Sequence, residues 1–196
     1  MDTARDERMA AAYLPQGNVV SVLYEQHAQI RDLFEEVGMV EGEARRAGFD
    51  ALRRLLAKHE AAEEVVLRPV TERLLPTGFT RARAAEERDM AGELAELERM
   101  DVDGPEFPPR FRLLEEALWL HASHEETDEF PAVLTRLTEA EQQAMGRWLL
   151  RAMERGPVHS HPMIGGPLAA EQPVAGSYAA LLIHARERLA ATKDEQ

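Results

Sequence analysis

The sequence contains no cysteine, so thiolate metal ligands, disulfide bonds and cysteine nucleophiles are all excluded. It also lacks an apolar run near the roughly 20 residues that a membrane-spanning helix needs. Sustained alternation of β-branched and polar residues, the pattern of half-buried strands, is missing as well. The first residues mix acids and bases before their apolar part and do not resemble a signal peptide. We therefore expect an all-α, cytoplasmic protein with no membrane span.

Basic residues are also few: 23 lysines and arginines stand against 36 aspartates and glutamates, and the formal net charge is −13. A nucleic-acid-binding protein needs a basic surface to displace counterions from phosphates. We therefore expect neither nucleic acid nor acidic membrane lipid as a partner. Catalytic triads, phosphate-binding glycine loops and dinucleotide fingerprints are absent too. Solubility is the simplest reason for the acidic balance, but any acid buried inside the fold needs a cation to neutralise it.

Helix patterns are strong and fall into long blocks separated by short breaks that contain proline or glycine. Apolar residues recur every three or four positions in each block, which places them on one stripe of a helix. Four long blocks with short connections predict an antiparallel up-down four-helix bundle. The expected helices are residues 18–42, 49–75, 80–100 and 108–130, followed by 139–155 and 178–191.

The bundle is expected over residues 18–135, with an N-terminal arm at 1–17 and a C-terminal helical extension and flexible tail at 136–196. Asn18 fits the N-cap of the first long helix. Pro131 is expected to kink or close the fourth one, because proline lacks the backbone N–H that a helix interior uses.

Polar residues interrupt the apolar stripes, and the interruptions match between helices. Burying an ionisable group costs kilocalories unless the group is paired or binds a metal. A single histidine on such a stripe is ordinarily a hydrogen-bonded core residue, but six ionisable groups near the middle of one core need a common explanation. The six are His27, His59, Glu63, Glu87, His121 and Glu125.

Spacing supplies that explanation. His59 and Glu63 are four residues apart, so both project from one helix face toward one point, and His121 and Glu125 repeat the arrangement. The repeat is longer than the pair, because residues 59–69 (HEAAEEVVLRP) and 121–131 (HASHEETDEFP) both read His-x3-Glu-Glu-x4-Pro. Imidazole and carboxylate together suit iron, manganese or zinc. Three histidines and three carboxylates exceed the needs of one tetrahedral zinc and suit two metals bridged by carboxylates.

Residues beside these candidates are expected to play lesser roles. A helix turns about 100° per residue, which swings Glu64 and Glu126 aside to support the ligands or face the surface. Glu60 is expected to be solvated, and His124 is expected on the flank of the bundle.

At these residues the sequence resembles the hemerythrin-like, or HHE cation-binding, family. The resemblance covers roughly residues 18–135 and is carried by three segments: LYEQHAQIRDLFEEV, LLAKHEAAEEVVLRPV and LWLHASHEETDEFPAVL. It implies a four-helix bundle with a di-iron site whose carboxylates and an oxo or hydroxo group bridge the metals. His27, His59 and His121 are the implied terminal ligands. Glu63 and Glu125 are the implied bridges.

The third helix departs from the family pattern. Glu87 stands where the family usually has a histidine, and Ala91 stands where true hemerythrins have a second one. The resemblance therefore implies a site with fewer nitrogens than an oxygen carrier has, and we expect redox chemistry or sensing rather than O2 storage.

The expected function is that of a non-haem di-iron protein that handles or senses O2, peroxide, nitric oxide, or the iron or redox state. One alternative is a peroxide- or NO-consuming di-iron oxidoreductase. Another is a metal-free helical interaction protein, and a mononuclear zinc or manganese site is a further one.

Overall fold

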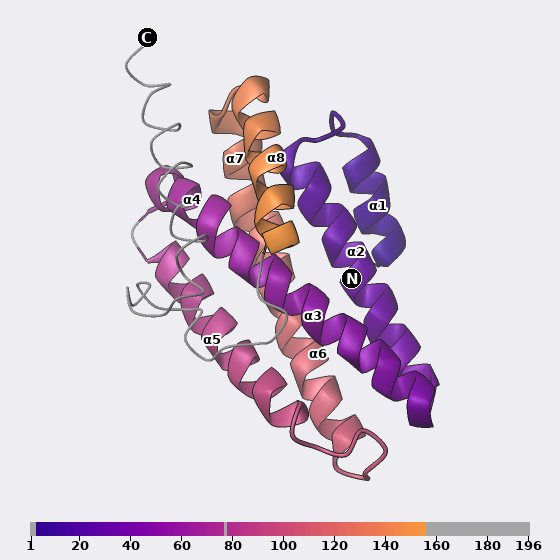
Figure 1. Cartoon of the computed structure of the whole chain (residues 1–196). Coiled ribbons are helices and arrows are strands. Elements are labelled where there is room, and N and C mark those ends of the chain that lie inside the picture. The colour runs from indigo at the N-terminus through magenta and orange to yellow at the C-terminus, as the bar shows by residue number, and fades with distance from the viewer. Residues whose placement is uncertain (1–2, 77, 156–196) are drawn as a thin grey trace.

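The computed structural model describes residues 3–76 and 78–155, and the regular elements in these ranges are all helical (Figure 1). The long helices lie in the four blocks that the sequence predicts, which confirms the all-α bundle with a C-terminal helical extension. The elements are α1 (Ala4–Ala12), α2 (Val19–Met39), α3 (Gly42–Val66), α4 (Arg68–Leu74), α5 (Phe79–Leu97), α6 (Phe107–His124), the π-helix η1 (Glu125–Glu129), α7 (Phe130–Arg136) and α8 (Glu139–Arg155).

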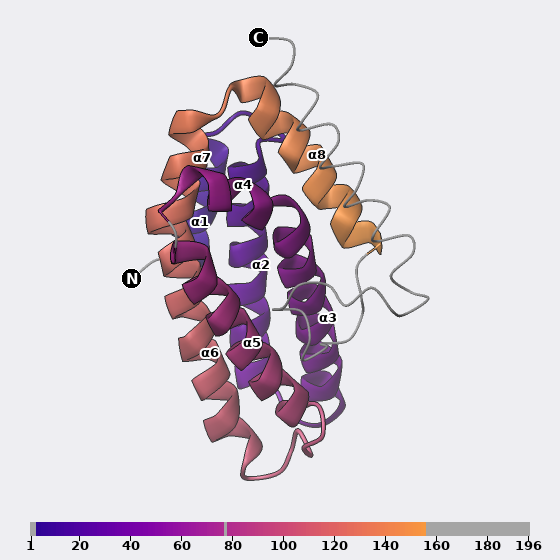
Figure 2. The ribbon, with the colours of Figure 1, turned by 90° about the vertical axis from the view of Figure 1, so that its left-hand side faces the viewer.

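Four rods form the bundle, and Figure 2 shows them running side by side along its length. The first is α2, and the second is α3 followed by α4. The third is α5, and the fourth is α6 followed by η1 and α7. Asn18 caps α2 as predicted, since its side chain accepts a hydrogen bond from the N–H of Val20. The predicted helix 49–75 is longer at its start than expected and breaks at Leu67, where α4 begins with Pro69 in its first turn.

Two additional helices cover the outside of the bundle. Helix α1 packs along α2 and buries Glu7 and Ala11, so part of the expected N-terminal arm is an ordered helix. Helix α8 packs against α3 and α2. Gly146 lets α8 pack closely against the backbone at Gly17, because a Cβ atom at position 146 would lie 2.1 Å from the carbonyl oxygen of Gly17. The predicted helix 178–191 lies outside the described residues.

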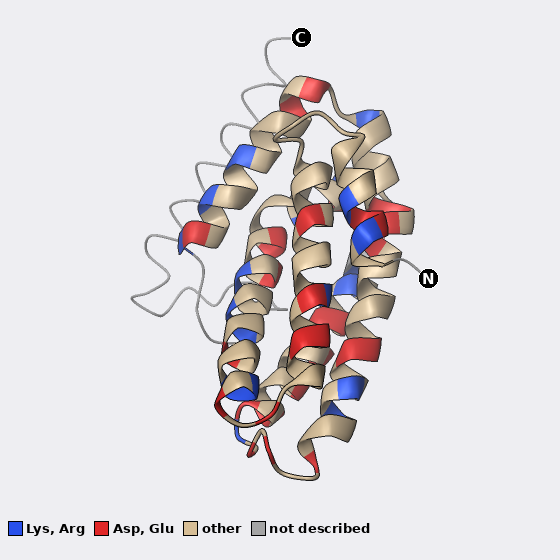
Figure 3. Ribbon diagram, turned by 90° about the vertical axis from the view of Figure 1, so that its right-hand side faces the viewer, with Lys and Arg blue, Asp and Glu red and all other residues tan. Residues whose placement is uncertain are grey.

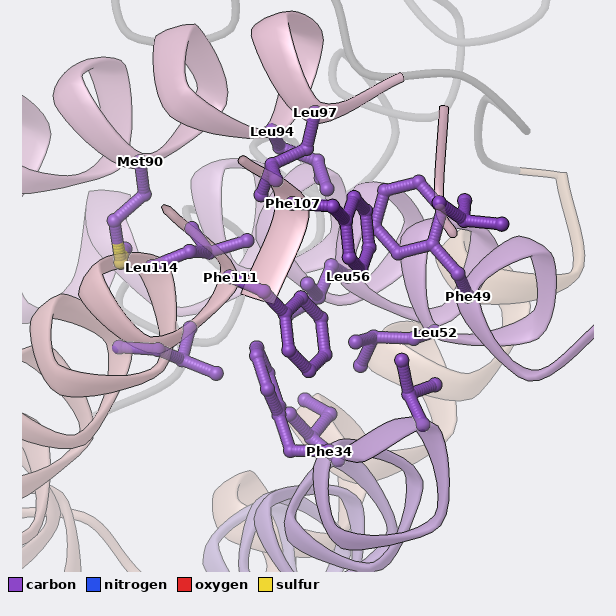
Figure 4. Close-up of a cluster of buried hydrophobic side chains, with 14 residues drawn as sticks. Phe34, Phe49, Leu52, Leu56, Met90, Leu94, Leu97, Phe107, Phe111 and Leu114 are labelled. Carbon is purple, nitrogen blue, oxygen red and sulfur yellow. The ribbon is translucent and has the colours of Figure 1, made fainter. Parts of the chain in front are cut away.

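The apolar core consists of two clusters stacked along the bundle. One lies near α8 and includes Leu23, Ala62 and Phe130. The other lies toward the far end and is built around stacked and edge-on aromatic rings (Figure 4). Its labelled members are Phe34, Phe49, Leu52, Leu56, Met90, Leu94, Leu97, Phe107, Phe111 and Leu114.

A polar layer separates the two clusters. His27 lies between Leu23 of one cluster and Ile30 of the other along α2, and α3 changes cluster at His59 in the same way. His121 follows the last member of the second cluster on α6, and the next member of the first cluster is Phe130 of α7. Because apolar layers cover both sides, groups in this layer are removed from water. The fold thus places ionisable side chains in the middle of a dry core.

Pro131 does not close the fourth long helix, which continues through it to Arg136. Instead, α6 passes into one turn of π-helix, in which the N–H of Phe130 donates to the carbonyl of Glu125, and Pro131 falls in the first turn of α7, where its missing N–H is tolerated. A π-helical turn has more residues than an α-helical turn, so it changes which side chains face the core. Glu125 and Glu129 are both buried.

Acidic and basic residues are interspersed along the helices (Figure 3). Within residues 3–76 and 78–155, no helix is long and apolar enough to cross a membrane.

Candidate metal centre

Three histidines from three different helices converge in the polar layer. His27 lies on α2, His59 on α3 and His121 on α6, and all three are buried. The rings of His27 and His59 are edge to face, with centroids 5.2 Å apart. A small cavity of about 10 Å³ lies against all three rings and is closed by Ile30, Leu118, Trp119 and Ala122.

Each histidine is oriented by a hydrogen bond from its Nδ1 atom. His27 Nδ1 lies 2.8 Å from Glu126 Oε1, and His121 Nδ1 lies 3.1 Å from Glu86 Oε2. The third ring, His59, pairs its Nδ1 with the amide oxygen of Gln26 at 2.8 Å. A hydrogen-bond acceptor beside Nδ1 favours the tautomer that carries its proton on Nδ1. The Nε2 atom is then available to bind a metal.

The Nε2 atoms face carboxylates. His59 Nε2 lies 3.5 Å from Glu63 Oε1, and Glu125 lies between the other two rings, 3.6 Å from His27 Nε2 and 3.3 Å from His121 Nε2. Many of these buried atoms have no hydrogen-bond partner. They include His27 Nε2, His121 Nε2, both oxygens of Glu60 and Glu63, and one oxygen each of Glu87, Glu125 and Glu129.

One basic side chain enters the same layer. Arg68, at the start of α4, contacts Glu87 with Nη2, reaches Glu125 Oε1 at 3.3 Å with the same nitrogen, and reaches Glu129 Oε1 at 2.6 Å with Nη1. Three carboxylates, from Glu87, Glu125 and Glu129, therefore contact this guanidinium, and the buried oxygens of Glu60 and Glu63 have no hydrogen-bond partner. The site has more acid than its arginine can neutralise.

Electrostatics divide the titratable groups into two sets. Burial opposes the charge on His27, but the neighbouring carboxylates of Glu125 and Glu126 outweigh it and raise its pKa to about 9. His121 behaves alike, since Glu125 raises its pKa well above the ordinary value despite burial. Burial also disfavours the charge on Glu125, yet His121 and His27 hold the pKa of Glu125 well below its usual range.

His59, Glu60 and Glu63 favour their neutral forms instead. Burial and the neighbouring His27 lower the pKa of His59 to about 3. Burial raises the pKa of Glu60 to about 8, and burial together with Glu125 raises the pKa of Glu63 well above its usual value. Without a metal, protons take the place of cations in this layer.

A second cavity of about 30 Å³ adjoins the carboxylate side of the layer. Its walls are apolar side chains of α3, α5 and α6, and Glu60 and Glu87 are its polar members. Ala91 lines it at the position where the sequence resemblance would place a second histidine. The small residue leaves space beside the site.

The six residues that the sequence singles out lie together. Side-chain atoms of His27, His59, Glu63 and Glu125 approach within 4.8 Å of one another, as do those of Glu87, His121 and Glu125. Two overlapping ligand groups that share Glu125 fit two ions better than one. The orphaned nitrogens and oxygens are the donors that such ions take.

The expectation for Glu60 is wrong. Although the residue is partly exposed, both of its carboxylate oxygens are buried, and one of them groups with Glu63 and His121. The position beside His59 points inward because α3 presents a broad face to the layer. Glu126 supports a ligand by binding His27, and His124 is partly exposed beside Glu86, 3.2 Å from it.

Four participants were not found from the sequence: Gln26, Arg68, Glu86 and Glu129. A signal existed for Glu129, because it lies four residues after Glu125 on the same stripe. The direction of Arg68 depends on the helix break at Leu67, and no spacing rule predicts it.

The family described as "Hemerythrin HHE cation binding domain" matches residues 18–133 of the chain. Among solved structures, the chain is similar to a hemerythrin HHE cation binding domain-containing protein from Mycobacterium kansasii, with a TM-score of 0.64 and 28% sequence identity. The similarity covers 70% of this chain and 86% of that one. No curated protein is significantly similar in sequence. The matched residues include every helix that contributes to the polar layer.

Proposed function

Because the chain belongs to the hemerythrin HHE cation-binding family, we propose that it binds two iron ions and uses them to handle or sense O2, peroxide, nitric oxide or redox state. The observation that carries the proposal is the convergence of three Nδ1-anchored histidines on carboxylates that lack partners. Apolar clusters bury the layer on both sides, and metal ions would neutralise the carboxylates that Arg68 does not contact.

The residues divide between two positions. His27, His59 and Glu63 would hold one ion, while His121 and Glu87 would hold the other, with Glu125 placed to serve both. Iron bound there supplies one-electron redox chemistry and an open coordination position for a small molecule. Manganese or zinc would find the same donors, and metal analysis separates these possibilities.

Three features of the chain suit an uncharged small ligand. The cavity of about 30 Å³ that Glu60 and Glu87 help to line is large enough for a molecule of a few atoms. Its apolar walls favour a neutral guest over an ion. Ala91 and Glu87 in place of imidazoles make the site rich in carboxylate, which supports redox chemistry or sensing.

The first test is metal content. Protein produced in iron-rich medium is expected to retain about two ions per chain, as carboxylate-bridged bundle sites do. His59→Ala and Glu63→Ala are expected to lose most of this metal. His124→Ala is the matched control, because this histidine is half-buried outside the converging set and is expected to leave metal content unchanged. Metal-free wild-type protein would contradict the proposal and favour a helical interaction protein.

The second test separates sensing from turnover. The anaerobic ferrous protein is mixed with nitric oxide, O2 or peroxide, and its absorption spectrum and the concentration of the added molecule are followed. A stoichiometric spectral change indicates binding or sensing. Consumption of many equivalents of peroxide or nitric oxide indicates the alternative function, an oxidoreductase.

A further inference from the structure

Arg68 is the residue of the polar layer that the proposed function does not use. Its side chain is only 4% exposed, and two elements supply the three carboxylates around it: α5 through Glu87, and η1 through Glu125 and Glu129. A buried guanidinium is costly unless carboxylates surround it in good geometry. The fold therefore holds this cation in a fixed place.

That place overlaps one of the two metal positions. Glu87 and Glu125 both give an oxygen to the guanidinium, and both belong to the ligand group completed by His121. Each also keeps one buried oxygen without a partner. An ion entering beside His121 would meet ligands already neutralised in part by Arg68.

At the other position, Arg68 contacts only Glu125, the ligand that both positions share. Within the described ranges, the ion-pair contact of Glu63 is with His59, at 3.5 Å, and no arginine or lysine lies within 4.0 Å of it. His27 and His59 pair with Glu126 and Gln26, which support the rings without adding positive charge. The two positions thus differ in the cation that the protein itself supplies.

We propose that Arg68 is a built-in cation that competes with the second metal ion, so that the two positions fill in order. The first ion binds at His27, His59, Glu63 and Glu125. The second binds more weakly beside Glu87 and His121, because it must share or displace the guanidinium. When one metal ion per chain is available, the ion therefore occupies the first position, and Arg68 remains the cation at the second. This inference rests on the proposed metal centre.

Stepwise titration with Co²⁺ tests the proposal, since Co²⁺ is stable in one oxidation state and its absorption reports each bound ion. Metal-free wild-type protein is expected to show two steps, with the second at least about tenfold weaker. Arg68→Met removes the charge and keeps much of the volume, and should tighten the second step at least about tenfold while leaving the first nearly unchanged. Arg68→Lys retains one charge without the planar fork and should fall between the two.

The matched control is Arg45→Met. Arg45 is another largely buried arginine on α3, hydrogen-bonded to the carbonyls of Val40 and Val102. It lies 14 residues before His59, about 20 Å along the helix. The Arg45→Met substitution should leave both steps of the Co²⁺ titration as they are in the wild type.

Thermal unfolding with and without Co²⁺ provides a second measurement. Metal-free Arg68→Met should unfold at a lower temperature than wild type, and saturating Co²⁺ should recover most of the difference. If Arg68→Met does not fold without metal, the titration of Arg68→Lys decides the question. An unchanged or weakened second step in these folded variants would overturn the proposal. Absence of any Co²⁺ binding by the wild type would instead overturn the proposed metal centre.

Discussion

The pH dependence of stability is the sharpest consequence of the buried acid. In the metal-free protein, the pKa of Glu60 is raised to about 8 and that of His27 to about 9, against 4.5 and 6.5 in ordinary surroundings. Each folded group therefore keeps a proton that the unfolded chain has released. A group with a raised folded pKa contributes stability that is present below the unfolded pKa and is lost as the pH rises through the folded pKa.

The size follows from proton linkage. For each proton that is bound only in the folded state, the free energy of unfolding falls by about 1.4 kcal/mol for every unit by which the pH rises. Both groups act between pH 6.5 and 8, so together these two contribute at most about 2.7 kcal/mol per pH unit there, and we expect roughly half of that after local relaxation. Glu63 and His121 shift their pKa values in the same direction and add to the slope.

Urea unfolding followed by circular dichroism measures this slope from pH 6.5 to 9. The metal-free protein should lose stability across the range, whereas the metal-loaded protein should not, because its ligands have already released their protons. Glu60→Gln should lower the metal-free slope by roughly 0.7–1.4 kcal/mol per pH unit below pH 8, the share of a single proton. A flat metal-free curve, or identical slopes with and without metal, would refute the reasoning.

The remaining predictions concern packing and support of the site. Gly146→Ala should cost at least about 2 kcal/mol, since its Cβ would meet a backbone oxygen at 2.1 Å. Gly92→Ala, with open space around it in a helix, should instead gain about 0.5–1 kcal/mol. Asn18→Ala removes a helix cap and a buried hydrogen bond and should cost about 1–2 kcal/mol. Glu126→Ala, which frees Nδ1 of His27, should weaken metal binding about 10–100-fold.

Thermal unfolding measures the first three changes, and Co²⁺ titration measures the last. Similar melting temperatures for the two glycine variants would contradict the close packing of α8. An unaltered metal affinity in Glu126→Ala would show that the orientation of His27 does not depend on this carboxylate.

Much of the architecture was predictable from local patterns. The apolar stripes fix the four long helices, and spacings of four residues place His59 with Glu63 and His121 with Glu125 on common faces. These signals are local because helix geometry depends on neighbours three or four positions away. The convergence of all six predicted residues follows from their shared level in the bundle.

The rest depends on features with no short-range signature. Nothing in the composition of EETDE indicates the π-helical turn after His124, although the four-residue spacing from Glu125 gave a local signal for Glu129 itself. The break at Leu67 aims Arg68 inward, and a broad inner face of α3 buries the oxygens of Glu60. Such details arise from packing between helices, which spacing within one helix does not specify.

The central claim is that two ions neutralise the polar layer. Its most direct test is an anomalous-scattering map at the iron edge from crystals of the iron-saturated protein. We predict two peaks roughly 3.5–4 Å apart, one beside His27 and His59 and the other beside His121 and Glu87. No peak in the layer, or iron found only at surface carboxylates, would contradict the account.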